Sequence, residues 1–303
     1  MSQYVPWRTG DERLKLAIVR QRGDGAAVLY VHGATFPASM SVGWCMQGVS
    51  WLDHLQESGF DAWGFDFAGY GGSSRPAALA GPADAAPPFG DSVAAAAQII
   101  EVLEHIHHVR PNTPIHVVAH SWGTLPARRV AAERPDLIQR LVLFGPVATR
   151  AGDRNTRPEP AWQLITSAMQ RPRQREGMPD ALPTPVTAQE LERWCDAYLA
   201  TDGTSASRAP ASVKVPNGPM ADIARMWAGE RLVDSGRVKQ PTLIIRGEWD
   251  DVTTDSDAQR LFAELGAAEK RDIKIAGGNH WLHLQPQRTA LWAEVTAFLK
   301  EPA

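Results

Sequence analysis

The sequence of 303 residues has only two cysteines, Cys45 and Cys195. Two cysteines cannot build the disulfide framework of a small secreted domain or a cysteine-rich zinc module. The sequence also has no run of about 18 apolar residues that could cross a membrane, and its N-terminal residues lack the apolar segment of a signal peptide. We therefore expect a soluble, cytoplasmic protein that does not bind membranes.

The sequence has no large excess of charge of either sign. Its 31 Lys and Arg are balanced by 34 Asp and Glu, for a net charge of −3. This balance argues against nucleic-acid binding driven by bulk charge. With 44% hydrophobic and 21% charged residues, the composition is that of a folded globular protein. A small-molecule substrate is the expected partner, and the composition leaves the oligomeric state open.

Short apolar runs alternate with longer helical patterns along most of the chain. Runs rich in Val, Ile and Leu predict strands at 26–32, 61–67, 115–120, 141–144, 242–246 and, more weakly, 271–276. Helices are expected at 92–109, 122–134, 256–265 and 288–299. Near-continuous apolar strands are typical of a parallel sheet covered on both faces. The pattern therefore predicts an α/β fold with a mainly parallel sheet flanked by helices.

Residues 149–239 break this alternation. They contain many prolines and several short helical patterns, but no run that reads as a buried strand. Proline at this density favours short helices joined by irregular turns. Because the strand and helix pattern resumes at Pro241, we interpret 149–239 as an insertion seated on one α/β core, rather than as a separate domain or a linker.

Ser121 is the predicted nucleophile. It lies in the segment IHVVAHSWG (115–123), where a buried strand runs into a helix. A serine in such a turn is held in a strained backbone conformation, with its hydroxyl clear of the sheet and near the helix N-terminus. The small residues Ala119 and Gly123 allow strand and helix to approach closely, although the common pattern has glycine where Ala119 stands.

A serine nucleophile needs a base and an acid that orients the base. Asp250 follows the strand 242–246 and is the predicted acid, with Asp251 as the alternative and Asp153 as a minor candidate. His280 follows two glycines and is the predicted base, with His283 as its rival. The chain order of serine, acid and histidine agrees with this assignment.

The backbone N–H groups of Ala34 and Trp122 are the predicted oxyanion hole. Trp122 follows the nucleophile directly, and Ala34 follows the strand that ends at His32-Gly33. Two such donors stabilise the charge that develops on the carbonyl oxygen. His32 is expected to brace this loop through hydrogen bonds.

No metal and no cofactor are expected. His105, His107 and His108 lie close together in sequence, but no set of ligands has the spacing of a zinc site. Cys45 has no base paired with it in this interpretation, so a packed or pocket-lining thiol is expected rather than a nucleophile.

Taken together, these motifs resemble the α/β-hydrolase superfamily over residues 30–300. The motifs are His32-Gly33, the turn DFAGYGGSSRP (66–76), the serine elbow, GEWDD (247–251) and GGNHW (277–281). The resemblance implies a cofactor-free Ser–His–Asp hydrolase with a core of 1–148 and 240–303 and a helical cap of 149–239. Serine at the elbow disfavours the haloalkane dehalogenase and epoxide hydrolase branches. Ser-Trp-Gly is similar to proline iminopeptidases, but HGATFP replaces their oxyanion loop, so peptidase activity is not inferred.

Eleven tryptophans indicate an apolar, partly aromatic pocket. Its predicted residues are Trp44, Cys45, Trp194, Trp227 and Trp281. The apolar stripe at 191–199 has helical spacing, which favours either a helix that closes the pocket or one that attaches the cap to the core. The expected substrate is a hydrophobic or aromatic carboxylic ester or a related acyl compound. The alternatives are a cofactor-free lyase, oxygenase or perhydrolase on the same fold, or a ligand receptor with slow turnover.

Overall fold

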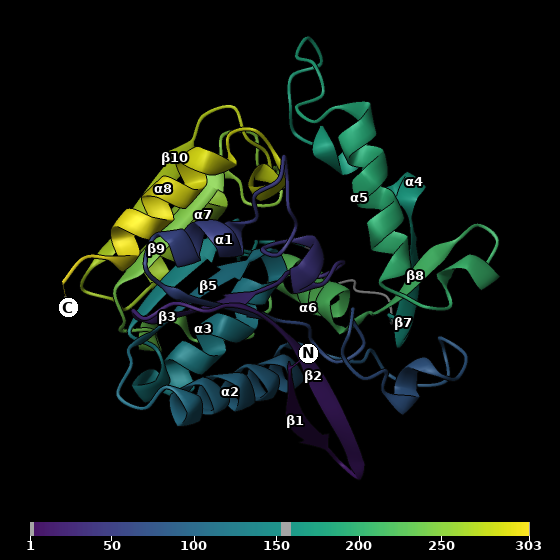
Figure 1. The fold of residues 1–303 in the computed structure, drawn as a ribbon, viewed down its shortest axis with the longest axis horizontal. Coiled ribbons are helices and arrows are strands. Elements are labelled where there is room, and N and C mark those ends of the chain that lie inside the picture. The colour runs from purple at the N-terminus through teal and green to yellow at the C-terminus, as the bar shows by residue number, and fades with distance from the viewer. Residues whose placement is uncertain (1–2, 153–158, 303) are drawn as a thin grey trace.

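The computed structural model describes residues 3–152 and 159–302. Its centre is an eight-stranded sheet in the order β1-β2-β4-β3-β5-β6-β9-β10 (Figure 1). From β4 onward the strands run parallel, whereas β2 pairs antiparallel with β1 and with β4. The mainly parallel sheet predicted from the apolar runs is therefore confirmed. Its strands are β1 (Gln3–Thr9), β2 (Glu12–Gln21), β3 (Ala27–Val31), β4 (Asp61–Phe65), β5 (Ile115–His120), β6 (Arg140–Phe144), β9 (Thr242–Gly247) and β10 (Lys270–Ile275).

Helices cover both faces of the sheet. One core joins α2 (Ser92–Val109), α3 (Thr124–Glu133) and α7 (Asp255–Glu264) to one face. A second core joins α1 (Trp51–Glu57) and α8 (Arg288–Leu299) to the other. Successive strand residues point to opposite faces, which is why the central strands must be apolar along their whole length. None of the helices in the described residues is long and apolar enough to cross a membrane.

Three elements near the N-terminus were missed by the sequence analysis. In β1 and β2, buried and more exposed positions alternate, so neither strand has the continuous apolar run of a central strand. Helix α1 is short, but it begins with a capping box in which Ser50 and Asp53 satisfy each other's backbone N–H groups. The sequence S-x-x-D was the available signal for this helix.

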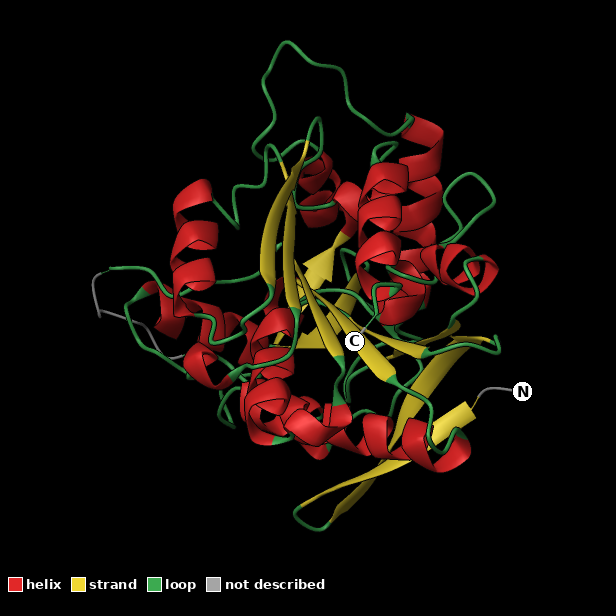
Figure 2. Cartoon of the chain, turned by 90° about the vertical axis from the view of Figure 1, so that its left-hand side faces the viewer, coloured by secondary structure: helices red, strands yellow, loops and turns green. Residues whose placement is uncertain are grey.

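The chain between β6 and β9, residues 145–241, is called the β6–β9 segment below, and its described part contains both helices and strands. It lies beside the large sheet, on the right of the view in Figure 1, and its two strands form a separate sheet (Figure 2). The expectation that it has only short helices is wrong, because Trp162–Thr166 pairs antiparallel with Ser212–Pro216. Its elements are β7 (Trp162–Thr166), α4 (Ser167–Gln170), α5 (Ala188–Ala200), β8 (Ser212–Pro216) and α6 (Gly218–Trp227).

Candidate active site

Ser121 occupies a strained turn between β5 and α3. Its φ of 56° lies in the left-handed region, which is costly for a residue with a side chain. The turn packs so closely against the end of β3 that a Cβ on Gly123 would lie 2.3 Å from the carbonyl oxygen of His32. Ser121 thus has the strained backbone conformation that the sequence analysis predicts for it, in a tightly packed turn.

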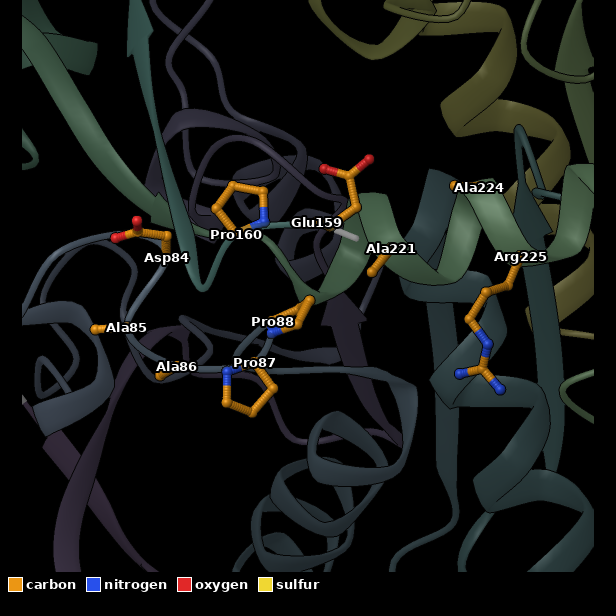
Figure 3. A pocket seen from close by; sticks show the side chains of 10 residues that line it. All are labelled: Asp84, Ala85, Ala86, Pro87, Pro88, Glu159, Pro160, Ala221, Ala224 and Arg225. Atoms are coloured by element: carbon orange, nitrogen blue, oxygen red, sulfur yellow. The ribbon is translucent and has the colours of Figure 1, made fainter. Parts of the chain in front are cut away.

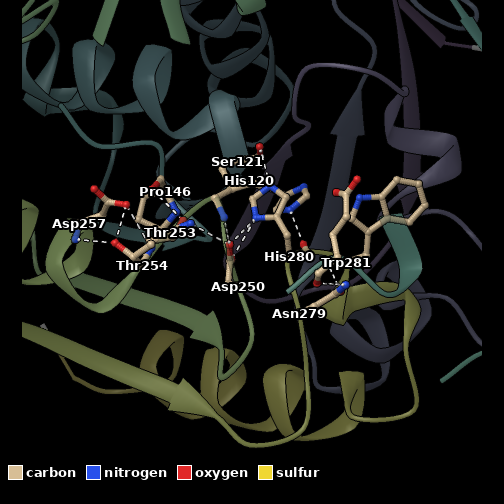
Figure 4. Close-up of polar contacts among 12 residues, drawn as sticks. His120, Ser121, Pro146, Asp250, Thr253, Thr254, Asp257, Asn279, His280 and Trp281 are labelled. Atoms are coloured by element: carbon tan, nitrogen blue, oxygen red, sulfur yellow. Dashed lines mark hydrogen bonds and ion pairs between the residues drawn. The ribbon is translucent and has the colours of Figure 1, made fainter. Parts of the chain in front are cut away.

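Ser121, His280 and Asp250 form one chain of hydrogen bonds (Figure 4). The Ser121 Oγ lies 2.8 Å from His280 Nε2, and His280 Nδ1 lies 2.9 and 3.0 Å from the two oxygens of Asp250. The Asp250 carboxylate can only accept, so Nδ1 carries the proton and Nε2 is free to accept from the serine hydroxyl. All three side chains are buried.

Two backbone features place Asp250 and His280 against each other. Asp250 Oδ1 also accepts hydrogen bonds from the backbone N–H groups of Val252 and Thr253, at 3.0 and 2.8 Å. Gly145, at the end of β6, has a φ of 54°, and a Cβ there would lie 3.0 Å from Asp250 Oδ2 and 3.1 Å from the His280 ring. A side chain at Gly145 would therefore press on both Asp250 and His280.

The rival acids and the rival base lie elsewhere. Asp251 is exposed and makes no hydrogen bond to His280, while Asp153 lies outside the described residues. His283 is buried against Phe144 and His120, with ring centroids 5.4 and 4.5 Å apart. Burial lowers the pKa of His283 to about 3, so it stays neutral at physiological pH.

The loop after β3 brings the Ala34 N–H to the same edge of the sheet as Trp122. Among the described residues, neither backbone N–H has a hydrogen-bond partner. Tyr70 donates its hydroxyl to the Ala34 carbonyl at 2.6 Å. His32 donates from Nδ1 to the Gly33 carbonyl and accepts at Nε2 from the Phe67 N–H, which requires a neutral ring. Burial lowers the pKa of His32 to about 4, so the loop keeps this brace at neutral pH.

A cavity of about 230 Å³ opens beside Ser121 and His280. The predicted pocket residues Trp227 and Trp281 line it, as does the predicted oxyanion residue Ala34. The sequence analysis missed most of its other wall residues, which carry no motif of their own. They are Thr35, Phe36, His120, Gln163, Ile165, Met169, Arg173, Met220, Ile223 and Val252, together with Gly33.

Trp44, Cys45 and Trp194 do not line this cavity, which corrects the prediction for these three residues. The Arg193 guanidinium lies over the Trp44 ring, 4.6 Å from the centroid of that ring. Cys45 is exposed. Trp194 is buried behind the wall, where its indole N–H donates to the Met40 carbonyl at 3.0 Å. Helix α5 is therefore attached to the loop after β3. Of the two interpretations of its apolar stripe, these contacts fit a helix that attaches to the core rather than one that closes the pocket.

Asp222 is a buried carboxylate that the sequence analysis did not single out. It lies on α6, and one of its oxygens accepts from the Trp122 indole N–H at 3.1 Å and from the Ser92 backbone N–H at 2.7 Å. Burial raises the pKa of Asp222 to about 6. The residue after Ser121 is thus tied through its side chain to the β6–β9 segment and to the first turn of α2.

A second, larger hollow of about 690 Å³ lies on the surface between the loop 84–88 and α6 (Figure 3). It is lined by none of Ser121, His280 and Asp250, whereas Ser121 and His280 line the smaller cavity. Within the described parts of the chain, no cluster of three His, Cys, Asp or Glu side chains could hold a metal ion.

Comparisons with known proteins agree with this architecture. The family model for the alpha/beta hydrolase fold matches residues 26–287. No curated protein matches the chain significantly. Among solved structures, the chain is similar to a probable hydrolytic enzyme from Pseudomonas aeruginosa PAO1, at 17% identity over 99% of this chain and 95% of that chain, with a TM-score of 0.69.

Two further solved structures share the fold. One is a serine hydrolase involved in carbazole degradation, at 14% identity over 99% of this chain and 98% of that chain, with a TM-score of 0.66. The other is epoxide hydrolase A from Mycobacterium thermoresistibile, at 19% identity over 99% and 98% of the two chains, with a TM-score of 0.63. At these identities the similarity shows a common fold.

Proposed function

Because the chain belongs to the α/β-hydrolase fold family, we propose that it is a serine hydrolase that cleaves a carboxylic ester or a related acyl compound through an acyl-enzyme. One observation carries this proposal. The buried chain Asp250–His280–Ser121 ends in a hydroxyl 2.8 Å from an imidazole nitrogen that can accept its proton, beside a cavity. A base at this distance activates a serine for nucleophilic attack.

The proposed reaction follows from the hydrogen bonds. His280 Nε2 removes the proton of Ser121 as the Oγ attacks the acyl carbon, and Asp250 stabilises the imidazolium that forms. The free N–H groups of Ala34 and Trp122 donate to the oxyanion. His280 then returns the proton to the leaving alcohol, and water activated by the same ring hydrolyses the acyl-enzyme. Serine as nucleophile requires an acyl substrate, so the proposal does not extend to epoxide or haloalkane opening.

We also propose that residues 149–239, the main part of the β6–β9 segment, act as a cap over a core formed by 1–148 and 240–303. These residues supply one wall of the cavity, whereas the core supplies Ser121, His280 and Asp250. Apolar side chains dominate this wall, which supports a hydrophobic or aromatic acyl group as substrate. The segment's wall residues are Gln163, Ile165, Met169, Arg173, Met220, Ile223 and Trp227.

The proposal is tested by turnover and covalent labelling. We expect p-nitrophenyl esters to be hydrolysed and a fluorophosphonate to label Ser121, and we expect Ser121→Ala to abolish both while the thermal unfolding curve is retained. The label is located by peptide mass spectrometry. Labelling at Cys45 or Ser73 would refute the assignment. Tight ester binding with negligible turnover would instead support a ligand receptor.

A further inference from the structure

The cavity wall contains one cationic side chain and no acidic one. Besides Ser121, the two histidines and Thr35, its polar side chains are Gln163 and Arg173. The remaining side chains are alkyl, aromatic or thioether groups. The Arg173 side chain is 27% exposed, so a guanidinium at this wall can attract a ligand that brings a negative charge to it.

Arg173 has hydrogen-bonding capacity to spare. Its Nε lies 3.4 Å from the Glu176 carboxylate, and its guanidinium lies 5.6 Å from the centre of the Trp281 ring. The guanidinium therefore forms an ion pair with Glu176, but within the described residues its two terminal nitrogens donate no hydrogen bond. These two N–H₂ groups form a planar fork that matches the two oxygens of a carboxylate.

The position of Arg173 is fixed relative to the catalytic histidine. The side chain of Asn279 donates to the backbone carbonyls of Arg173 and Glu176, at 2.9 and 3.0 Å. Asn279 is fully buried and directly precedes His280 and Trp281 on one loop (Figure 4). The turn that carries the guanidinium is therefore fastened to the loop that carries the base, so a subsite on Arg173 has a defined place relative to Ser121.

Gln163, on β7, adds a second unpaired donor to the same wall. Its amide nitrogen is buried and has no hydrogen-bond partner among the described residues. A buried donor without a partner is costly, and a turn of the Gln163 amide towards the cavity would let a ligand oxygen remove this cost. Donors from two different elements thus line the cavity, where the sequence predicts only apolar contacts.

We propose that Arg173 and Gln163 form a subsite for a carboxylate on the substrate, so that the preferred substrate is an apolar acyl ester that carries a second, ionised carboxyl group. This inference rests on the proposed hydrolase function and narrows its substrate class. The ester carbonyl lies at Ser121, the apolar chain contacts Met220, Ile223 and Trp227, and the free carboxylate pairs with the guanidinium.

The test compares matched substrates that differ only in the terminal group. We expect the mono-p-nitrophenyl esters of adipate and pimelate to have a higher kcat/KM than those of hexanoate and heptanoate, by about 10- to 100-fold, which is the usual effect of a hydrogen-bonded charge pair. The preference should shrink as salt is added, because salt screens partly exposed charges.

Two variants separate the subsite from general structural effects. Arg173→Met should remove the preference by lowering kcat/KM far more for the carboxylated esters than for the plain esters, and Arg173→Lys should restore part of it. Arg171→Met is the matched control, because Arg171 lies two residues away and pairs with Glu192 rather than lining the cavity. The control should keep the wild-type preference.

Binding to Ser121→Ala keeps this inference separable from the proposed function. The hydrolase proposal fails if wild type shows neither turnover nor fluorophosphonate labelling. The subsite still stands in that case if Ser121→Ala binds the adipate ester more tightly than the hexanoate ester and if this difference is lost when Arg173 is also replaced. Equal handling of both ester series by wild type, or equal losses for both in Arg173→Met, would overturn the subsite.

Discussion

At the scale of single residues, two glycines in the same backbone conformation have very different neighbours. Gly145 and Gly10 have φ values of 54° and 53°. A Cβ on Gly145 would press on Asp250 and His280, whereas a Cβ on Gly10 would meet nothing within 4 Å. The pair therefore separates the cost of backbone strain from the cost of displacing the acid and the base.

We expect Gly145→Ala to lower kcat for a p-nitrophenyl ester by about 100-fold, because misplaced catalytic groups typically have effects of this size. Gly10→Ala should lose about 1 kcal/mol of unfolding free energy through strain and retain its kcat. Steady-state kinetics and denaturant unfolding of both variants check this. Equal losses of kcat in the two variants would contradict the close packing at Gly145.

The residues with a chemical motif could be predicted from the sequence, and those without one could not. Ser121, Asp250 and His280 each follow a recognisable strand, so their convergence at one sheet edge follows from the order of the strands. Trp194 was misplaced because helical spacing indicates which residues share a face but not what that face contacts. Asp222 gave no signal, since its partners Trp122 and Ser92 are distant in sequence.

At the scale of elements, Asp222 connects α6 to the residue after the nucleophile. In the unfolded chain its carboxyl ionises near its usual pKa of 3.8, while in the fold its pKa is raised to about 6. A raised carboxyl pKa stabilises the fold at low pH, and this contribution is lost as pH rises through about 6. The hydrogen bonds to Trp122 and Ser92 need only an acceptor, which an amide oxygen also supplies.

We expect the unfolding free energy of Asp222→Asn, taken relative to that of wild type, to rise by about 1.4 kcal/mol as the pH is raised from 5 to 7. Wild type loses the contribution of the raised pKa over this range, and the uncharged Asn does not. Asp222→Ala should instead lose about 1–3 kcal/mol at both pH values, because two buried donors lose their partner. Urea unfolding at the two pH values measures both effects. If Asn and Ala behave alike, the acceptor role of Asp222 is wrong.

Among elements, the central strands and the long helices were predictable and the marginal ones were not. Helices α2 and α8 have the predicted bounds, because Pro111 and the periodic apolar face mark them clearly. Strand β7 was missed since its residues are mostly half-exposed, and only pairing with β8 makes it a strand. Pairing between distant segments is a tertiary effect that local pattern does not reveal.

At the scale of the whole molecule, buried histidines determine the response to acid. Burial lowers the pKa of His32 and His116 to about 4 and that of His283 to about 3, and it also lowers the pKa of His120 well below its usual value. Asp66 and Asp222, whose pKa values burial raises to about 6, act in the opposite direction. Because these four histidines outnumber the two carboxyl groups, lowering the pH lowers the free energy of unfolding.

We expect the thermal midpoint to fall as pH is lowered from 6.5 to 4.5, because these histidines bind protons in the unfolded chain at pH values where they stay neutral in the folded chain. His283→Leu should reduce the slope of unfolding free energy against pH by about 1.4 kcal/mol per pH unit, because one fewer proton is taken up on unfolding. It should keep its stability at pH 7, since both ring nitrogens of His283 lack partners among the described residues.

Exposed His107 provides the control for this experiment. His107→Leu makes the same substitution at an exposed ring, and its slope is compared with that of His283→Leu. A His283→Leu protein with the wild-type slope would show that the acid response has another source.

The direct pairing of β6 with β9 has an evolutionary consequence. The chain leaves the sheet after Phe144 and re-enters it at Thr242, on the neighbouring strand. The entropy of closing such an excursion grows only with the logarithm of its length, so insertions and deletions between these two points disturb the sheet little. If the proposed function holds, selection could therefore replace this stretch and obtain new substrate preferences while the chemistry proposed for Ser121 is left unchanged.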